Sequence, residues 1–375
     1  MVDLIDAVAL SLVAGSRVRI AEALRAAARA GGVPRSGQGL ADVALRAEGA
    51  AEPGLEWMLH WIGQPVDAAS LARELRDAAC RALDVAARHR IEPVAWGDVR
   101  YPGLLAAIPD PPPVVWVRGD IGACARRAVA VVGSRAASPY GLDIAALVAS
   151  ELVPHVVVVS GLARGIDSAA HRGALDAGGA TVAVLGSGAD VIYPPEHAAL
   201  ADRIQACGAI VSELPPGSPP LAFHFPARNR IISGLSLAVV VIEAAEKSGS
   251  LITAACALEQ GREVMAVPGN ALSGRNRGSH ALIRDGAPIV ESGRDVLDQL
   301  GLVSMRPATC RAPGGPVDDP VLRCMAAGDT YDLDALARAA GIDPVKLLPR
   351  LLELELEGSV RRAGGGRFVR SGRTC

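Results

Sequence analysis

Three short runs of β-branched and small apolar residues decide the fold: "AVAVV" (128–132), "VVVVS" (156–160) and "TVAVL" (181–185). None of them shows the apolar–polar alternation of a half-exposed strand, which indicates strands that are covered on both faces. Stretches of helical length separate the runs, as expected of a parallel sheet built from strand–helix–strand units. The sequence therefore predicts a doubly wound α/β domain with an extended Rossmann-like sheet.

The same alternation of apolar runs and stretches of helical length continues over about residues 100–300. Further runs that suit strands are "AIVS" (209–212), "LAVVVIE" (237–243), "EVMAV" (263–267) and "PIV" (288–290). Upstream of the sheet, apolar residues recur at three-and-four spacing, which is typical of helices. We expect a small helical domain over residues 1–95, the sheet domain over 96–302 and a Pro- and Gly-rich linker over 303–317.

Residues 318–375 are predicted to form a winged-helix domain. Two short helices meet near Gly341, and a Gly-containing hairpin turns at 364–366. The segment carries nine basic and nine acidic residues, so contact with DNA, contact with a protein and a purely structural role all remain open. Its second helix carries four apolar residues on one side, namely Val345, Leu348, Leu352 and Leu356.

The formal net charge of the 375-residue chain is −2, so the chain as a whole does not attract nucleic acid. Any nucleic-acid site must therefore depend on a local group of basic residues. Lys247 and Lys346 are its only lysines, so an arbitrary arginine carries little information and Lys247 carries more. The seven cysteines are scattered without metal-ligand spacing, which predicts neither a metal site nor a disulfide framework. A secretory signal peptide and a run of about 20 apolar residues are both lacking, so we expect a cytoplasmic protein without a membrane span.

Ligands of open α/β sheets bind beyond the carboxyl ends of the strands. Three loops expected at that edge combine glycines with a cation: "GSR" (133–135), "GLARG" (161–165) and "KSGS" (247–250). Glycine allows close backbone approach, and helix N-termini favour anions, so the three loops predict a ligand rich in phosphate. The fingerprints of dinucleotide-binding sites and P-loops are absent, which argues against an oxidoreductase or an ordinary nucleoside triphosphatase.

Catalytic arrangements of side chains do not stand out. Asp167 and His171 are four residues apart, and we interpret them as a helix-surface pair or cap rather than as a catalytic pair.

The segment "AFHFPARNRIISG" (222–234) holds two of the three phenylalanines of the chain beside Arg228 and Arg230. Single-stranded nucleic acid is held by cations along its phosphates and by aromatic rings that stack on its bases. Phe225 is the principal stacking candidate and His224 a further one, whereas the other phenylalanine is expected to anchor this turn in the core. The segment therefore predicts a contact with single strands.

Several longer motifs occur in an order that resembles the DprA/Smf family of DNA-processing proteins: "VVGSRAASPYG", "SGLARGIDSAAHRGAL", "VAVLGSGADVIYPPEH", "HFPARNRIISGLS" and "EAAEKSGSLITAACALEQGREVMAVPG". The resemblance covers about residues 100–295. The N-terminal segment is more loosely similar to the sterile-alpha-motif-like domain of that family, and the C-terminal segment to its winged-helix domain.

The resemblance implies a homodimeric protein of natural transformation, without a known catalytic reaction or obligatory cofactor. Such a protein binds and protects incoming single-stranded DNA, displaces single-strand-binding protein and loads RecA. The glycine loops, the phenylalanine segment and the resemblance together predict the following DNA-binding residues: Gly133, Ser134, Arg135, Ser160, Gly161, Arg164, Gly165, Phe225, Arg228, Asn229, Arg230, Lys247, Ser248, Gly249 and Ser250.

Two other functions stay open. Nucleoside-monophosphate phosphoribohydrolases of the lysine-decarboxylase-like group have a similar sheet domain, and they carry a PGGxGTxxE motif whose glutamate serves the chemistry. The comparable loop here, "KSGSLITAACALE", has no carboxylate between Gly249 and Glu259, which argues against hydrolysis. Alternatively, DNA binding is incidental, and the winged helix binds a partner or regulates division or competence.

Overall fold

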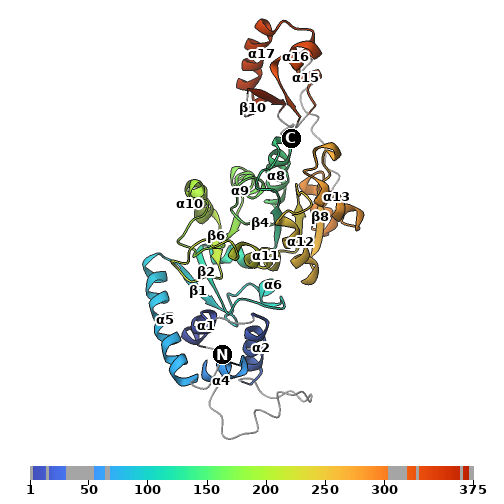
Figure 1. Ribbon diagram of the computed structural model, residues 1–375. Helices are drawn as coiled ribbons and strands as arrows, with labels where there is room; N and C mark the ends of the chain where they lie inside the picture. Colours follow the sequence, from blue (N-terminus) through green and yellow to red (C-terminus); the bar gives the residue numbers. More distant parts are fainter. Residues whose placement is uncertain are drawn as a thin grey trace.

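The computed structural model describes residues 3–13, 17–30, 55–63, 68–302, 319–326, 329–363 and 366–370. They form a helical N-terminal part, a central sheet domain and a C-terminal winged-helix domain (Figure 1). The linker expected at 303–317 lies outside the described residues. None of the helices described is both long and apolar enough to cross a bilayer.

The described residues of the N-terminal part form four helices packed around a core of leucines and alanines, and the last of these leads into the sheet. Asp6 is buried among these helices, where it accepts hydrogen bonds from the Leu55 amide (3.1 Å) and from Nε of Arg76 (2.7 Å). A buried carboxylate needs such donors, so this pair fixes how the helices meet. The helices are α1 (Leu4–Ser11), α2 (Arg17–Ala30), α4 (Leu55–Trp61) and α5 (Ala68–Arg88).

The central sheet has eight strands in the order β1-β2-β6-β5-β4-β3-β7-β8. The strands from β6 to β8 in this order are parallel, and β2 and β1 add an antiparallel pair at one edge. The strands are β1 (Glu92–Ala95), β2 (Val114–Gly119), β3 (Ala128–Val132), β4 (Val157–Ser160), β5 (Thr181–Val184), β6 (Ala209–Ser212), β7 (Ala238–Val241) and β8 (Glu263–Ala266).

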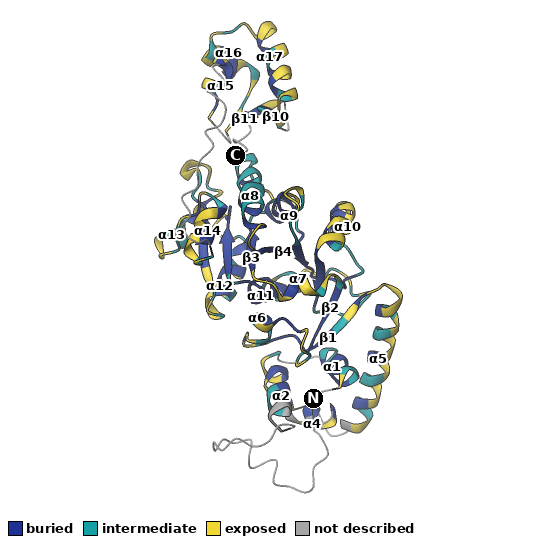
Figure 2. Cartoon of the chain, turned by 180° about the vertical axis from the view of Figure 1, so that it is seen from behind, coloured by how far each residue is buried: buried dark blue, intermediate teal, exposed yellow. Residues whose placement is uncertain are grey.

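Helices cover both faces of this sheet (Figure 2). Val129 and Val131 of β3 point to one face and pack with residues of α8, α9 and α14. Ala130 and Val132 point to the other face and pack with residues of α6, α11 and α12. The helices are α6 (Gly103–Ala106), α7 (Ile121–Ala125), α8 (Pro139–Leu152), α9 (Ile166–Asp176), α10 (Ala198–Cys207), α11 (His224–Gly234), α12 (Ser250–Glu259), α13 (Arg277–Arg284) and α14 (Gly293–Gln299), with 3₁₀ turns at Pro195–His197 and Ala271–Ser273.

The predicted doubly wound sheet is thus confirmed, with two differences. The run "PIV" (288–290) forms only an isolated bridge between Ile289 and Ala266, not a strand. The antiparallel pair β1–β2 was not predicted, although it places Trp116 wholly inside the core. Because β1 belongs to the sheet, the sheet begins four residues before the expected boundary at residue 96.

The C-terminal domain is the predicted winged helix. Gly341 ends α16 in the left-handed conformation (φ 67°), which glycine adopts without strain, and this allows the turn into α17. The strands form a small sheet in the order β10-β11-β9. The elements are α15 (Pro320–Arg323), β9 (Thr330–Tyr331), α16 (Leu333–Ala340), α17 (Pro344–Leu356), β10 (Val360–Ala363) and β11 (Arg367–Arg370).

The side of α17 that faces the winged-helix core consists of Leu347, Leu351 and Leu354, all of them buried. The apolar side noted in the sequence, Val345, Leu348, Leu352 and Leu356, is exposed. α17 is therefore apolar on two sides.

Helices α8 and α9 lie against each other through Gly173. A Cβ atom at this position would lie 2.6 Å from Cα of Ala146, in the backbone of α8. We expect Gly173→Ala to lower the free energy of unfolding by about 1–3 kcal/mol, because the helices have to separate. Gly103→Ala is the control, since nothing lies within 4 Å of its Cβ position. Chemical denaturation measures both, and equal stabilities would contradict this packing.

Candidate nucleic-acid interface

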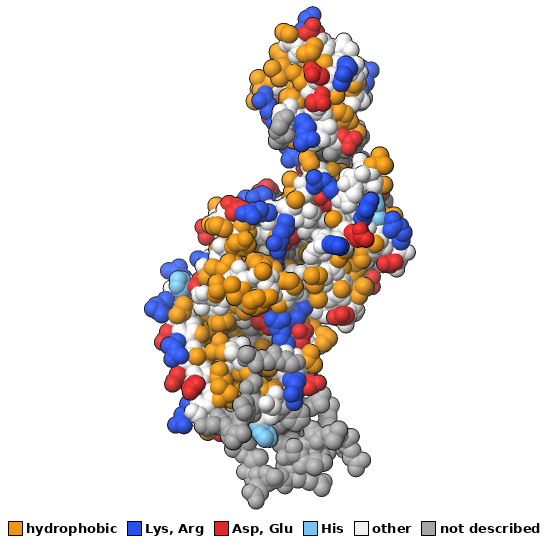
Figure 3. Space-filling model, viewed as in Figure 1, with side chains coloured by type: hydrophobic (Ala, Val, Ile, Leu, Met, Phe, Trp, Pro, Cys, Tyr) orange, Lys and Arg blue, Asp and Glu red, His pale blue; other side chains and the backbone are white. Residues whose placement is uncertain are grey.

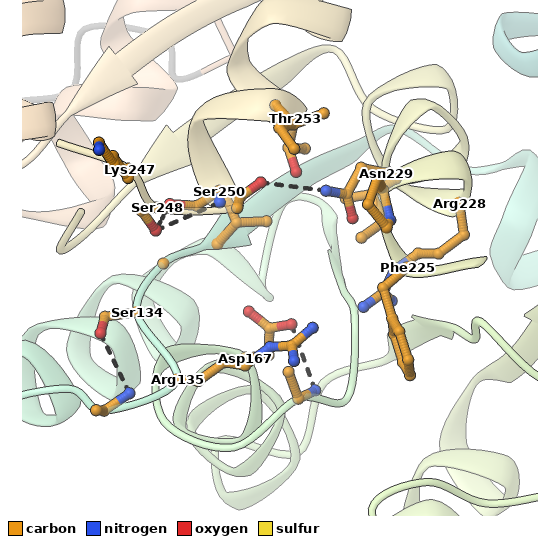
Figure 4. Close-up of a pocket in the computed structure, with 18 of the residues that line it drawn as sticks. Ser134, Arg135, Asp167, Phe225, Arg228, Asn229, Lys247, Ser248, Ser250 and Thr253 are labelled. Atoms are coloured by element: carbon orange, nitrogen blue, oxygen red, sulfur yellow. Dashed lines mark hydrogen bonds between the residues drawn. The ribbon is translucent and has the colours of Figure 1, made fainter. Parts of the chain in front are cut away.

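The order of the strands reverses between β3 and β7, and a cavity of about 760 Å³ lies at that point. From β3 the chain proceeds through β4 and β5 to β6 in one direction, and β7 then lies on the other side of β3. The loops that leave β3 and β7 therefore diverge and open a crevice. Figure 4 shows side chains from four segments around it: the loop after β3, the start of α9, the start of α11 and the turn before α12.

The loop after β3 is fixed by the backbone that follows β7. The Ser134 amide donates to the Glu243 carbonyl (2.7 Å), and a Cβ atom at Gly133 would lie 2.6 Å from Ile166. Gly133 therefore has no room for a side chain. The next residue, Arg135, is exposed at the cavity. The predicted "GSR" loop thus presents one accessible cation from a rigid backbone.

The glycines of the "GLARG" loop serve close packing inside the protein. A Cβ atom at Gly161 would lie 2.5 Å from Cζ of Arg228, and one at Gly165 would lie 2.9 Å from the carbonyl carbon of Arg135. Ser160 is buried, and its hydroxyl donates to the Val131 carbonyl (2.6 Å). Neither Ser160 nor these two glycines line the cavity.

Arg164 also lies outside the cavity lining. It is exposed and forms an ion pair with Glu196. A strand would have to extend past the cavity to reach it, so its contact with DNA stays a prediction.

The turn before α12 faces the cavity with Lys247, Ser248, Gly249 and Ser250. The Ser248 and Ser250 hydroxyls are 2.8 Å apart, and Asn229 of α11 donates from Nδ2 to the Gly249 carbonyl (3.2 Å). Lys247 is exposed. The amides of the first turn of α12 donate within the turn, from Leu251 to the Ser248 carbonyl (3.1 Å) and from Ile252 to the Gly249 carbonyl (3.2 Å). This helix end therefore favours an anion through its positive dipole.

Arg228 lies under the cavity and is only 5% exposed. Its Nη1 donates to the Val184 carbonyl, and its Nε has no hydrogen-bond partner among the described residues. Burial lowers the pKa of Arg228 to about 10, against the attraction of Asp167, so the guanidinium remains charged at neutral pH. It is a fixed charge at the floor of the cavity.

Asp167 is the one carboxylate among the described residues that line the cavity. Burial raises its pKa, while the charge of Arg228 and the Ala163 amide (3.4 Å) oppose that rise. His171 is wholly buried beside Thr181 (2.7 Å), and burial lowers its pKa to about 3. The interpretation of Asp167 and His171 as a helix-surface pair is therefore wrong.

Two aromatic rings and a cation form a layer at one wall of the cavity. The rings of Phe225 and Tyr193 have centroids 5.6 Å apart, and the Arg135 guanidinium lies 5.2 Å from the centroid of Phe225. Phe225 is half-buried above Gly186, where a Cβ atom would lie 3.0 Å from the ring. Tyr193 was not predicted, although its segment "VIYPPEH" follows a strand that ends at the same sheet edge.

Phe223 differs from the expectation that it anchors this segment in the core. Its side chain is 67% exposed, and its ring contacts only that of His224 among the ring pairs of the described residues (4.4 Å between centroids). The segment is also not a turn, because His224–Gly234 forms α11 with Pro226 in its first turn, where proline is tolerated.

The helix separates Arg228 from Arg230, since residues two apart lie on opposite sides. Arg230 is buried away from the cavity, where its Nε lies 3.0 Å from Asp110 and its Nη2 pairs with Glu213. Arg17 of α2 joins this cluster at 3.7 Å from Glu213. Glu213 thus joins Arg230 of the sheet domain to Arg17 of the N-terminal helices, and the geometry gives no contact between Arg230 and a ligand of the cavity.

Glu243 occupies the N-terminus of α8, which follows the first parallel strand. Its carboxylate accepts hydrogen bonds from the Ser138 amide (3.1 Å) and from the Ser138 hydroxyl. A dinucleotide site would place its pyrophosphate at this helix terminus. An internal carboxylate there repels such a ligand, in agreement with the missing fingerprint.

Removal of the Arg230 side chain would leave the carboxylates of Asp110 and Glu213 without their main partner. We expect Arg230→Ala to lower the free energy of unfolding by about 3–5 kcal/mol, as for other broken buried pairs. Arg17→Ala removes the exposed end of the same cluster and should lower the free energy of unfolding by about 1 kcal/mol or less. Denaturant titration of both variants checks this, and a small loss for Arg230→Ala would contradict a structural role.

The model of the family described as DNA recombination-mediator protein A matches residues 92–301, and that of the DprA winged helix domain matches residues 306–366. Protein Smf of Escherichia coli (strain K12) is 43% identical over 285 residues, which cover 73% of this chain and 76% of that protein. DNA processing protein DprA of Streptococcus pneumoniae is 49% identical over 200 residues, 53% of this chain and 71% of that protein.

Two solved structures are similar to the fold described above. The X-ray structure of DNA processing protein A from Streptococcus pneumoniae has a TM-score of 0.67 and 36% identity, and the match covers 80% of this chain and 98% of that one. A structure of DNA processing protein A from Helicobacter pylori, described in terms of its single-stranded DNA binding mode, has a TM-score of 0.51 and 26% identity. That match covers 56% of this chain and 97% of that one.

Proposed function

Because this chain belongs to the DNA recombination-mediator protein A (DprA/Smf) family, we propose that it binds and protects single-stranded DNA through the cavity between β3 and β7. The observation that carries the proposal is the convergence of two exposed cations, Arg135 and Lys247, with the aromatic layer of Phe225 and Tyr193 around one cavity. Cations match phosphates and flat rings match unpaired bases, which is the combination that single strands require. Duplex DNA should bind more weakly, because its bases are already stacked.

The cavity attracts a polyanion locally. On the face shown in Figure 3, basic and acidic side chains are interspersed and do not form one broad basic surface. Around the cavity, Arg135, Arg228 and Lys247 outweigh Asp167, whose charge burial disfavours. The exposed cations can bind phosphates directly, while the buried guanidinium of Arg228 adds a fixed positive potential.

We propose that the protein acts by binding and not by catalysis. Asp167 is the one carboxylate among the described residues that line the cavity, and it faces the charge of Arg228. The turn before α12 lacks the glutamate that the phosphoribohydrolase motif requires. These observations support a site that binds a polyanion and that has no pair of side chains suited to acid–base catalysis.

The remaining parts of the proposed role follow from the family. We propose that the protein acts in natural transformation and recombination, where it displaces single-strand-binding protein, loads RecA onto the bound strand and works as a homodimer. The description of the family as recombination mediators supports this role.

Lys247→Ala should remove one phosphate contact without disturbing the fold, because this side chain is exposed. We expect weaker binding to oligo-dT, and a slope of log K against log salt that falls by about 0.7. Arg135→Ala should have the same effect on the slope. Arg294→Ala, an exposed arginine on α14 paired with Asp298, is the control and should leave the slope unchanged. Mobility shifts over a salt series measure this, and unchanged binding in both cavity variants would exclude the site.

Phe225→Ala should weaken oligo-dT binding by a different route. Loss of one base stack costs about 1–3 kcal/mol, or about 5- to 150-fold in affinity, and leaves the salt slope nearly unchanged. On an oligonucleotide with abasic positions, the variant and the unmodified protein should bind alike. Phe223→Ala is the matched control, because this exposed ring does not line the cavity. An equal loss in both variants, or a loss that persists on abasic DNA, would contradict stacking by Phe225.

A further inference from the structure

Helix α17 of the winged-helix domain exposes an apolar stripe that nothing described in this chain covers. Its members are Val345 (81% exposed), Leu348 (46%), Leu352 (48%) and Leu356 (82%). A surface helix normally turns a polar side to water, since its other side already supplies the core. Hydrophobic side chains also gather on the α17 side of this domain in Figure 3, at the end of the molecule away from the sheet. Such a stripe indicates a docking surface.

The stripe nearly matches itself when the helix is reversed. Its residues are spaced by three, four and four positions and lie on one side of the helix. Reversal puts Val345 in the place of Leu356, whereas Leu348 and Leu352 each fall one position from the other's place. A second copy of α17 in antiparallel orientation therefore presents its stripe within one residue of the same positions, as a two-fold interface allows.

The charges beside the stripe favour the same orientation. Lys346 stands at the start of the helix, and Glu353 and Glu357 stand toward its end on the same flank, all three exposed. Residues that flank an antiparallel helix pair meet across the interface and select the orientation by their charge. The antiparallel pairing brings Lys346 of each copy toward Glu357 of the other, and toward Glu353, which also pairs with Arg350 of its own helix.

Contact of this face with DNA is disfavoured by the same residues. A helix that reads a DNA groove presents hydrogen-bond donors to base edges and cations to phosphates. The outward side of α17 presents aliphatic side chains, Pro349 and the carboxylates of Glu353 and Glu357. Of its two cations, Arg350 pairs with Asp319 and Glu353, and Lys346 is exposed. The nearby cations Arg361 and Arg362 of β10 are already paired, with Asp143 and Glu355 respectively.

We propose that α17 is a self-association surface, through which two copies of this chain pair by antiparallel packing of their apolar stripes. The inference rests on the winged-helix domain alone and is independent of the DNA site. One pair of short helices buries less area than a standard stable interface, so the contact is weak in isolation. If the homodimer proposed above forms through another surface, the α17 contact joins those dimers into larger assemblies.

The test is the mass of the full chain in solution, measured by light scattering or sedimentation over a concentration series. Leu352→Asp places a charge at the centre of the stripe and should weaken the self-association by about 100-fold or more, so that the average mass falls by half at concentrations where the contact forms. Val99→Asp is the matched control, because Val99 is an isolated, 98% exposed residue before α6 and its replacement should leave the mass unchanged. Thermal unfolding shows whether each variant remains folded.

A charge exchange tests the orientation. Lys346→Glu alone and Glu357→Lys alone should each weaken the association by about tenfold, since each puts like charges at both ends of the interface. The double variant Lys346→Glu/Glu357→Lys should return to within about threefold of the unmodified protein. The proposal is overturned if Leu352→Asp leaves the mass unchanged, which would mean that another partner covers the stripe. It is equally overturned if the double variant associates no better than the single ones.

Discussion

The pairing of β3 with β7 is the constraint on which the rest of the central domain depends. These two neighbours are parallel and in register from Val129 opposite Ala238 to Val132 opposite Val241. Beyond their ends, the Ser134 amide donates to the Glu243 carbonyl (2.7 Å) and the Ile242 amide donates to the Val132 carbonyl (3.0 Å). The two chains then diverge to helices on opposite faces of the sheet, and the cavity exists because nothing fills the space between them.

The arginines in and near this cavity differ in burial and in their partners, and the sequence around them does not reveal these differences. Arg135 is exposed and packs on an aromatic ring, Arg228 is buried beneath the floor, and Arg230 lies in an ion-pair cluster with two carboxylates. A desolvated guanidinium is held in one place and cannot follow a ligand, whereas an exposed one can. The buried arginine therefore organises the site, and the exposed cations are the ones available to bind a ligand.

The winged-helix domain shows a similar division on a single helix. α17 supplies the domain core with Leu347, Leu351 and Leu354, and a second apolar stripe faces outward. The balance of nine basic and nine acidic residues in the segment leaves this surface open to protein as well as to DNA. The sheet domain and the winged-helix domain would then serve different partners, single-stranded DNA and a second copy of the chain.

The sequence by itself determined the parallel sheet, the edge at which its loops gather and the family. Runs such as "AVAVV" leave no polar side for water, so burial on both faces follows from composition alone, and the order of the glycine loops follows from the alternation of strand and helix. The winged helix was also predictable, since Gly341 marks the left-handed end of α16.

Only the tertiary structure decided which side chains face the cavity. Arg228 and Arg230 lie on opposite sides because they are two residues apart in a helix. The local sequence, with Pro226 in it, did not predict that helix. Tyr193 lies beside Phe225 although it comes from a loop distant in sequence. Phe223 is exposed, because no other described element of the fold covers it. The edge pair β1–β2 likewise depends on a neighbour, β6, about 90 residues further along the chain. Exposure and stacking depend on partners distant in sequence, and a single sequence does not say which partners those are.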